Sequence, residues 1–215
     1  MSLPLARIVA ALALGAFAIS PALADPLSPA KAEALRKRFE SRQRETRTWS
    51  ADFTQTLRMP GMRAPVLSEG TILYRAPGDL RIDFTKPAGE YVLILGDRLF
   101  IQKPGKRLAE KSMSDNAGRP FLSLIGMLQG RPAENEEQFE QEVSDAGGSY
   151  VIVLSKKPDA SKRLPKRITN VVTEGLNIRE VLVELPNGGS LAYSFRDISR
   201  NKALPAAAFS TPEQE

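Results

Sequence analysis

The chain has 215 residues, of which 42% are hydrophobic and 26% charged, with a formal net charge of +5 and with 15 Gly and 16 Pro. This composition is typical of one compact domain and not of a disordered chain, a coiled coil or a collagen-like repeat. The chain contains neither Cys nor His. Their absence excludes disulfide frameworks, zinc-finger sites, thiol nucleophiles, Ser-His-Asp triads and imidazole acid/base catalysis.

The first 24 residues have the pattern of a cleaved secretory signal peptide. A basic start ends at Arg7, an apolar run extends from Ile8 to Ile19, and the small-residue box Ala22-Leu23-Ala24 precedes Asp25. The apolar run is shorter than the roughly 20 residues that a transmembrane helix needs. We therefore expect export and a mature domain over residues 25–215; the alternative is an uncleaved membrane anchor.

A helix is predicted to begin at Ser28-Pro29 and to run to about Arg44. A Ser hydroxyl can cap free amides, and Pro is favoured at the first helical position. The apolar side of this helix is narrow, and residues 36–47 hold six cations against two acids. A solvated face with Glu40 and Arg44 paired is one interpretation. A docking surface for an acidic partner or an anionic membrane is the other.

From Trp49 onward the hydrophobic period changes from 3.6 to 2, which predicts strands. Apolar and polar residues alternate over 49–57 and 80–85. Further strands are predicted at 69–75, 91–95, 98–102, 149–155, 167–173, 178–185 and 189–198, with Gly and Pro turns between them. Roughly ten short strands with no helices between them exclude a parallel βαβ order. They predict a large antiparallel sheet that curls or closes.

Residues 119–129 interrupt the strands with an almost continuous apolar run that Pro120 opens. A short helix here would be apolar nearly all round, so we expect it to be buried at the mouth or on the concave face of the curled sheet. An outer-membrane barrel is disfavoured, because such barrels need aromatic girdles and only 7% of this chain is aromatic.

Charge is segregated along the rest of the chain. Residues 134–145 carry six acids and no Lys or Arg, whereas residues 156–167 carry six cations against Asp159. Nucleic-acid binding is disfavoured because aromatic residues are not interleaved with the cations. The acidic run has no EF-hand spacing, which favours a solvated face over a metal site.

The order of several short stretches resembles the periplasmic lipoprotein-carrier family of the LolA type over nearly the whole mature chain. The matching stretches are WSADFTQ at 49–55, GTILYRAPGDLRIDF at 70–84, GDRLF at 96–100, PFLSLI at 120–125 and FSTP at 209–212. The resemblance implies a mainly β fold with few helices. It would be an incomplete antiparallel β-barrel of about ten to eleven strands, lidded by short α-helices over an apolar cavity that shields acyl chains.

The apolar residues of the strands and of the internal helix are the candidates for the lining of such a cavity. Those from the sheet are Trp49, Phe53, Ile72, Leu80, Ile82, Phe84, Val92 and Ile94, and those from the lid are Phe121, Leu124, Ile125 and Leu128. Any one of these positions also fits an ordinary core residue, so the prediction concerns the set.

Three positions depart from the family pattern. The family has an Arg-Pro pair in which the Arg is thought to latch the lid; here Ala76 precedes the Pro, and Arg75 stands one place earlier. Adjacent residues of a strand point to opposite faces of the sheet, so Arg75 would not face the same side as the family's Arg. Ile82 and Phe100 stand where the family has Trp. We expect the control of the lid to differ here.

These patterns favour two functions and disfavour a third. The first is a periplasmic carrier, which ferries acylated lipoprotein or a related lipid such as a glycolipid or phospholipid from an inner-membrane transporter towards the outer membrane. Such a carrier would work as a monomer without a cofactor, and whether an outer-membrane acceptor exists is left open. The second is a periplasmic lipid-sensing regulatory protein on the same fold. An enzyme is disfavoured, because only carboxylates such as Asp52 and Asp83 or a Ser-Lys dyad remain to act.

Overall fold

The computed structural model describes residues 24–115, 118–129, 136–162 and 164–211. The expected signal peptide lies outside these residues except for Ala24. The elements in chain order are β1 (Asp25–Pro26), α1 (Pro29–Arg44), β2 (Thr48–Arg58), β3 (Val66–Arg75), β4 (Asp79–Lys86), β5 (Glu90–Leu95), β6 (Arg98–Gln102), β7 (Ala109–Ser112), α2 (Arg119–Leu128), η2 (Glu136–Gln138), β8 (Phe139–Asp145), β9 (Ser149–Lys156), β10 (Arg167–Thr173), β11 (Ile178–Glu184), β12 (Ser190–Arg200) and η3 (Ala206–Phe209).

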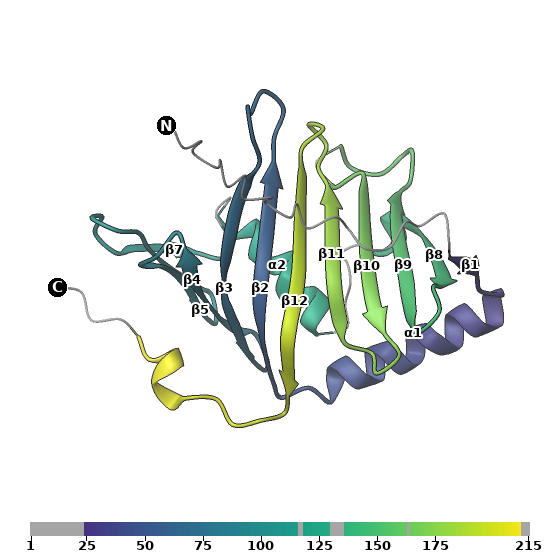
Figure 1. Cartoon of the computed structure of the whole chain (residues 1–215), viewed down its shortest axis with the longest axis horizontal. Helices are drawn as coiled ribbons and strands as arrows, with labels where there is room; N and C mark the ends of the chain where they lie inside the picture. Colours follow the sequence, from purple (N-terminus) through teal and green to yellow (C-terminus); the bar gives the residue numbers. More distant parts are fainter. Residues whose placement is uncertain (1–23, 116–117, 130–135, 163, 212–215) are drawn as a thin grey trace, which may run out of the picture.

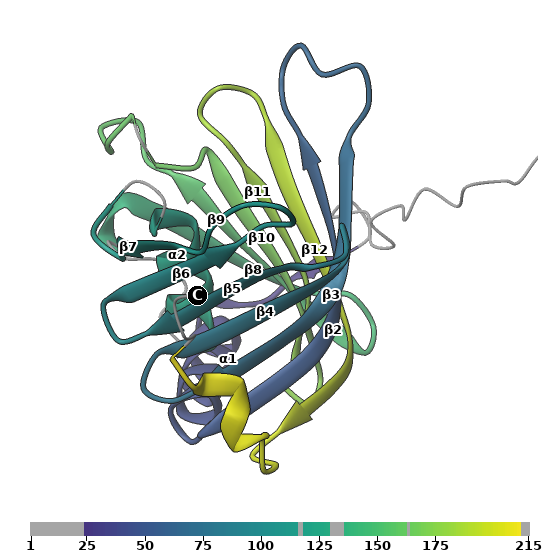
Figure 2. The ribbon, with the colours of Figure 1, turned by 90° about the vertical axis from the view of Figure 1, so that its left-hand side faces the viewer.

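All strands belong to one antiparallel sheet with the order β1-β8-β9-β10-β11-β12-β2-β3-β4-β5-β6-β7. The sheet curls strongly, but its edge strands β1 and β7 do not pair, so it is an open barrel (Figure 1, Figure 2). The predicted fold class is confirmed, with twelve strands instead of ten or eleven. Strands β1, β7 and β8 were not predicted, because none of them has a run of alternating apolar residues.

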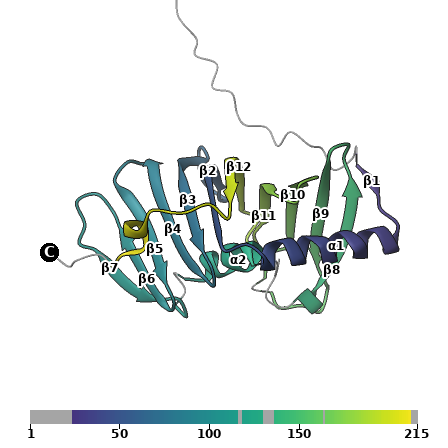
Figure 3. The same cartoon turned by 90° about the horizontal axis from the view of Figure 1, so that it is seen from below.

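Both α-helices lie inside the curl of the sheet (Figure 2). They follow one another along the same edge when the protein is seen from below (Figure 3). Helix α1 contributes Leu35 and Phe39 to the buried apolar cluster, and α2 contributes residues from its C-terminal half. The buried position expected for the internal apolar helix is therefore confirmed.

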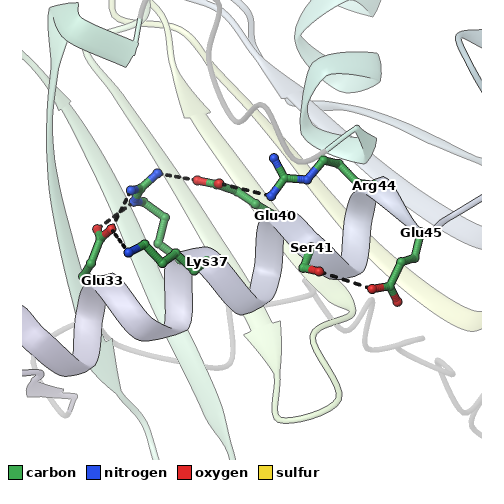
Figure 4. Close-up of polar contacts among 7 residues, drawn as sticks. Glu33, Lys37, Glu40, Ser41, Arg44 and Glu45 are labelled. Carbon is green, nitrogen blue, oxygen red and sulfur yellow. Dashed lines mark hydrogen bonds and ion pairs between the residues drawn. The ribbon is translucent and has the colours of Figure 1, made fainter.

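Helix α1 buries one narrow stripe and exposes a network of ion pairs. The buried residues Leu35, Phe39 and Gln43 are four apart, as one face of a helix requires. On the polar side, Arg44 pairs with Glu40 at 3.8 Å, as predicted, and Lys37 pairs with Glu33 at 3.4 Å (Figure 4). Such exposed pairs contribute little individually.

The predicted helix start is correct in position, but the predicted cap is wrong. Ser28 is the N-cap residue and Pro29 follows it, yet the Ser28 hydroxyl makes no capping hydrogen bond. Instead, the carbonyl of Ser28 accepts the first helical bond from the Ala32 amide at 2.9 Å. Pro29 has no amide hydrogen to satisfy, which lessens the need for a side-chain cap.

The end of α1 is fixed to the sheet by the guanidinium of Arg200, at the end of β12. Its Nη1 donates to Thr46 Oγ1 at 2.6 Å, and its Nη2 donates to Asn177 Oδ1 at 3.0 Å and to the Leu176 carbonyl at 3.1 Å. Burial, together with the nearby positive charge of Arg42, lowers the pKa of Arg200 to about 10. One side chain thus links the C-terminus of α1 to the β10–β11 turn.

The convex side of β5 and β6 carries a second, smaller apolar cluster. Leu93 and Phe100 point to this side, and Phe209 of η3 covers them. The Arg81 side chain donates to the carbonyl of Ala208 at 3.2 Å. The C-terminal segment therefore packs on the outside of the sheet and leaves the concave face to α1 and α2.

Candidate functional site

Inward-facing side chains of β2 to β5 form rows that cross the concave face of the sheet. Strand pairing aligns them as Trp49–Tyr74–Leu80–Ile94 and Ala51–Ile72–Ile82–Val92. No member of either row is more than 7% exposed. Because strand positions alternate between faces, each row presents apolar groups to the interior at every strand.

A third row depends on a glycine. Gly70 pairs with Phe53 on one side and with Phe84 on the other. The two rings meet edge to face with their centroids 5.6 Å apart. A Cβ at position 70 would lie 2.9 Å from the Phe53 ring and 2.0 Å from the Asp83 carbonyl. Glycine therefore allows two aromatic rings to touch across an intervening strand.

Helix α2 covers these rows. Leu124 and Ile125 are each 8% exposed, and Leu128 is 1% exposed. All three belong to the same buried cluster as the sheet rows, and Phe121 packs against it. The side chains of the sheet and of the helix thus share one apolar interior.

The structure brings all twelve predicted lining residues together. Ten are buried members of one cluster, and Phe84 and Phe121 pack against it. Their proximity is therefore confirmed, whereas their contact with an acyl chain stays a prediction.

Sixteen of the 26 buried residues of this cluster were not among the predicted lining residues. They are Leu35, Phe39, Ala51, Tyr74, Leu99, Met113, Phe139, Val143, Ile152, Leu154, Ile168, Val172, Leu176, Ile178, Val181 and Phe195. The alternation within 149–155 and 189–198 could have found several of them, because those segments were predicted as strands with one buried face.

Two polar groups interrupt the apolar interior on its β10 and β12 side. Tyr193 stacks on Phe195 with ring centroids 5.9 Å apart, and burial raises the pKa of Tyr193 to about 12, so its hydroxyl stays neutral. Asn170 is 4% exposed, and the structure gives its Oδ1 no hydrogen-bond partner. Asn170 thus places an unpaired polar atom within the otherwise apolar interior.

A hydrogen bond at the C-terminal end of α2 holds the helix to the sheet. The Gln129 side-chain amide donates to the carbonyl of Pro77, in the β3–β4 turn. The Tyr74 hydroxyl donates to the same carbonyl at 3.3 Å. Gly78 lies beneath this end of the helix, where a Cβ would approach Gln129 and Ile125 at 3.8 and 3.9 Å.

Arg75 cannot perform the latching role that the family resemblance gives to an arginine at the next position. It lies on the convex face, where it bonds Asp79 at 2.6 Å and its guanidinium stacks over the Phe209 ring at 4.4 Å. Ala76 packs against the concave cluster. In this structure Gln129, and not an arginine, makes the contact between α2 and the turn, and the expected difference in lid control stays a prediction.

Removal of the Gln129 amide is expected to loosen the lid. The change Gln129→Ala deletes a hydrogen bond worth about 0.5–1.5 kcal/mol, so amide exchange within α2 should become about two- to thirteenfold faster. Hydrogen–deuterium exchange with mass spectrometry measures this rate. Arg75→Ala is the matched control and should leave α2 unchanged. Faster exchange in Arg75→Ala but not in Gln129→Ala would contradict this assignment.

The carboxylates considered for catalysis do not reach the concave face. Asp52 and Asp83 flank Thr71 on the convex side, where Asp52 accepts from Thr71 at 3.3 Å and Asp83 accepts from Arg81 at 2.7 Å. Within the part of the chain that the structure describes, no group of three acidic residues is placed to hold a metal ion. No described helix combines the length and the apolar character that a membrane span requires.

These features define an open antiparallel barrel in which a helical cover closes an apolar concave face. The sequence model of the family described as outer membrane lipoprotein carrier protein LolA matches residues 44–212. The chain belongs to this family.

Individual proteins are also similar to this chain. The outer-membrane lipoprotein carrier protein of Dechloromonas aromatica (strain RCB) is 28% identical over 167 residues, which is 77% of each chain. The crystal structure of MucB is similar in fold, with a TM-score of 0.53 and 12% identity; the match covers 86% of this chain and 64% of MucB. A LolA superfamily protein from Nitrosomonas europaea matches over 84% of this chain and 97% of its own, with 12% identity and a TM-score of 0.42.

Proposed function

We propose that this protein is a periplasmic carrier that shields the acyl chains of a lipoprotein, or of a related lipid, between the inner and outer membranes. Membership of the lipoprotein-carrier family supports this role. The observation that carries the proposal is the shared interior, in which α2 covers the apolar rows of β2 to β5 and contributes Leu124, Ile125 and Leu128 to the same cluster.

The energetics of acyl chains explain why such an interior is needed. Each buried methylene is worth roughly 0.8 kcal/mol, so a long acyl chain gains on the order of 10 kcal/mol by leaving water. Free diffusion of a lipidated protein through an aqueous compartment is therefore forbidden. An acyl chain that enters between α2 and the sheet would replace apolar contacts between the two by apolar contacts with the chain, which keeps loading and release close in free energy.

Displacement of α2 is the step that we assign to loading. The helix contacts the sheet through apolar side chains, which have no directional preference, and through the Gln129 bond to Pro77. Methylenes of the acyl chain can replace the apolar contacts, and water can replace the hydrogen bond. In this proposal the cargo comes from an inner-membrane transporter that supplies any energy, because the chain contains no nucleotide-binding motif.

Native mass spectrometry of the protein purified from its own periplasm tests this function. The expected result is a bound species with the mass of an acylated lipoprotein or of a lipid, released when the protein is denatured. A second sample, purified after exposure to inner-membrane vesicles that hold an acylated lipoprotein, should carry that lipoprotein. Protein that stays empty in both samples, or that is recovered with an unacylated peptide instead, would overturn the proposal and favour a regulatory role.

A further inference from the structure

The β2–β3 hairpin exposes large apolar side chains at its end. Met62, Val66 and Leu67 are 42%, 47% and 50% exposed, and they are the large hydrophobic residues that stand out by exposure in the described parts of the chain. The hairpin extends beyond the neighbouring turns of the sheet (Figure 1, Figure 2). A gathering of exposed apolar groups at one projecting point is typical of a contact surface.

The apolar groups lie on both faces of the hairpin. Val66 pairs with Leu57, and Leu67 pairs with Thr56, so the adjacent residues 66 and 67 point to opposite sides of the ribbon. Met62 lies in the turn between β2 and β3. A protein partner docked on one face would leave the other face wet, whereas the hydrocarbon region of a bilayer surrounds an inserted hairpin on all sides.

The hairpin is also supported at its base. Close packing holds Met59 against the β11–β12 turn, where a Cβ at Gly189 would lie 2.7 Å from the Met59 sulfur. Pro60 lies beside Gly188 of the same turn. The neighbouring hairpin thus fixes the direction in which the apolar tip projects.

Positive charge gathers at the same edge of the sheet. Alternate turns of an antiparallel sheet lie at one edge, which places the loops 59–65, 103–108 and 157–166 together. Among their described residues these loops hold seven cations and one acid, Asp159, with the exposed Glu137 of η2 beside the last loop. The exposed cations Arg63, Lys103, Lys106, Arg107, Lys162 and Lys166 form no ion pair with a described carboxylate.

The turns of the opposite edge, at 45–47, 76–78, 96–97, 146–148, 174–177 and 201–205, hold three acids and two cations. Helix α1 also lies along that edge (Figure 1, Figure 3), and its residues carry six cations against two acids. An anionic surface would therefore attract both edges, and the exposed apolar side chains are what distinguish the edge of the β2–β3 hairpin. The basic face of α1, which the sequence analysis offered as a docking surface, is instead occupied in part by its own ion pairs.

We propose that the β2–β3 hairpin is a membrane contact, which inserts Met62, Val66 and Leu67 into an anionic bilayer while the cations of the same edge lie against lipid phosphates. Apolar insertion combined with electrostatic attraction is the general mode of peripheral membrane binding. The role of this contact, bringing the carrier to a membrane where cargo enters or leaves, rests on the proposed function. The contact itself does not depend on cargo.

Vesicle co-sedimentation of the purified protein tests the contact. The protein is expected to sediment with vesicles of phosphatidylethanolamine and phosphatidylglycerol, and to bind more weakly to phosphatidylcholine vesicles and at high salt. The double variant Met62→Glu/Leu67→Glu should bind at least about tenfold more weakly, and Arg63→Gln about fivefold more weakly. Ala203→Glu/Ala206→Glu adds the same two negative charges at exposed positions that follow β12 and is the matched control.

A site-specific probe separates insertion from adsorption. Because the chain has no Cys, Leu67→Cys can be labelled alone with an environment-sensitive fluorophore, and its emission should shift to the blue with anionic vesicles. The same label at Ala203→Cys should not respond. Wild-type protein that fails to sediment with anionic vesicles, a double variant that sediments as well as wild type, or a label at position 67 that stays in water would each overturn the proposal.

The failures of the two proposals are distinguishable. The hairpin variants are expected to keep the lipid found by native mass spectrometry, because they lie far from the buried cluster and their thermal midpoint should be unchanged. Loss of vesicle binding with cargo retained therefore concerns the hairpin alone. Absence of cargo with vesicle binding retained concerns the carrier function alone.

Discussion

Replacement of Leu128 with glutamate is expected to release acyl cargo from the protein while the sheet stays folded. Leu128 is 1% exposed and lies on the face of α2 that meets the sheet rows. A carboxylate at this position would be buried among apolar groups, which costs several kcal/mol when the charge is unpaired. The helix can avoid this cost by leaving the sheet, so the open state of the lid becomes the stable one.

The expected magnitude is a loss of cargo retention of at least about 100-fold, which corresponds to about 3 kcal/mol. Lipid bound per protein, measured by mass spectrometry after purification, gives the retention, and far-UV circular dichroism checks the sheet. Leu128→Met conserves volume and should retain lipid. A Leu128→Glu protein that is folded and carries as much lipid as wild type would show that α2 is not the cover of the binding site.

The strands and helices that the sequence predicts correctly are those with a strong local hydrophobic pattern. The strand at 167–173 and the helix from 29 to 44 agree with the structure because each has a clear period and clear end residues. Strand β8 was missed because Phe139 and Val143 are its only buried residues, and the acidic residues between them suggested a solvated segment. Strand β7 has no strongly apolar residue at all, and only its pairing with β6 makes it a strand.

The site was predictable only in part, for a related reason. Alternation indicates which side chains of a strand share a face, but it does not show which strands lie opposite a given helix. The aromatic contacts between β12 and β2, such as Trp49 with Phe195, follow from a pairing between the last strand and one of the first. Contacts at such separation in the chain, including Gln129 with Pro77, cannot be derived from local periodicity.

Substitution of Trp49 by alanine is expected to give the largest loss of stability. The indole is 1% exposed, lies near the middle of the sheet order and meets the Phe195 ring edge to face at 5.4 Å. Removal of a buried aromatic side chain costs about 3–5 kcal/mol, which includes the cavity that remains. For a domain of this size we expect the thermal midpoint to fall by about 10 °C or more.

Thermal and urea unfolding followed by far-UV circular dichroism measure this loss, since Trp49 is the sole tryptophan and its fluorescence disappears with it. Met62→Ala, on the exposed hairpin, should change the free energy of unfolding by less than about 0.5 kcal/mol and serves as the control. The value for Trp49→Ala also bears on carriage, because the cost of a large-to-small change depends on how tightly its surroundings pack. A loss below about 1 kcal/mol would mean that the indole already borders loosely filled space, whereas the full loss would mean that the resting interior is solid and that acyl chains gain room only when α2 moves away.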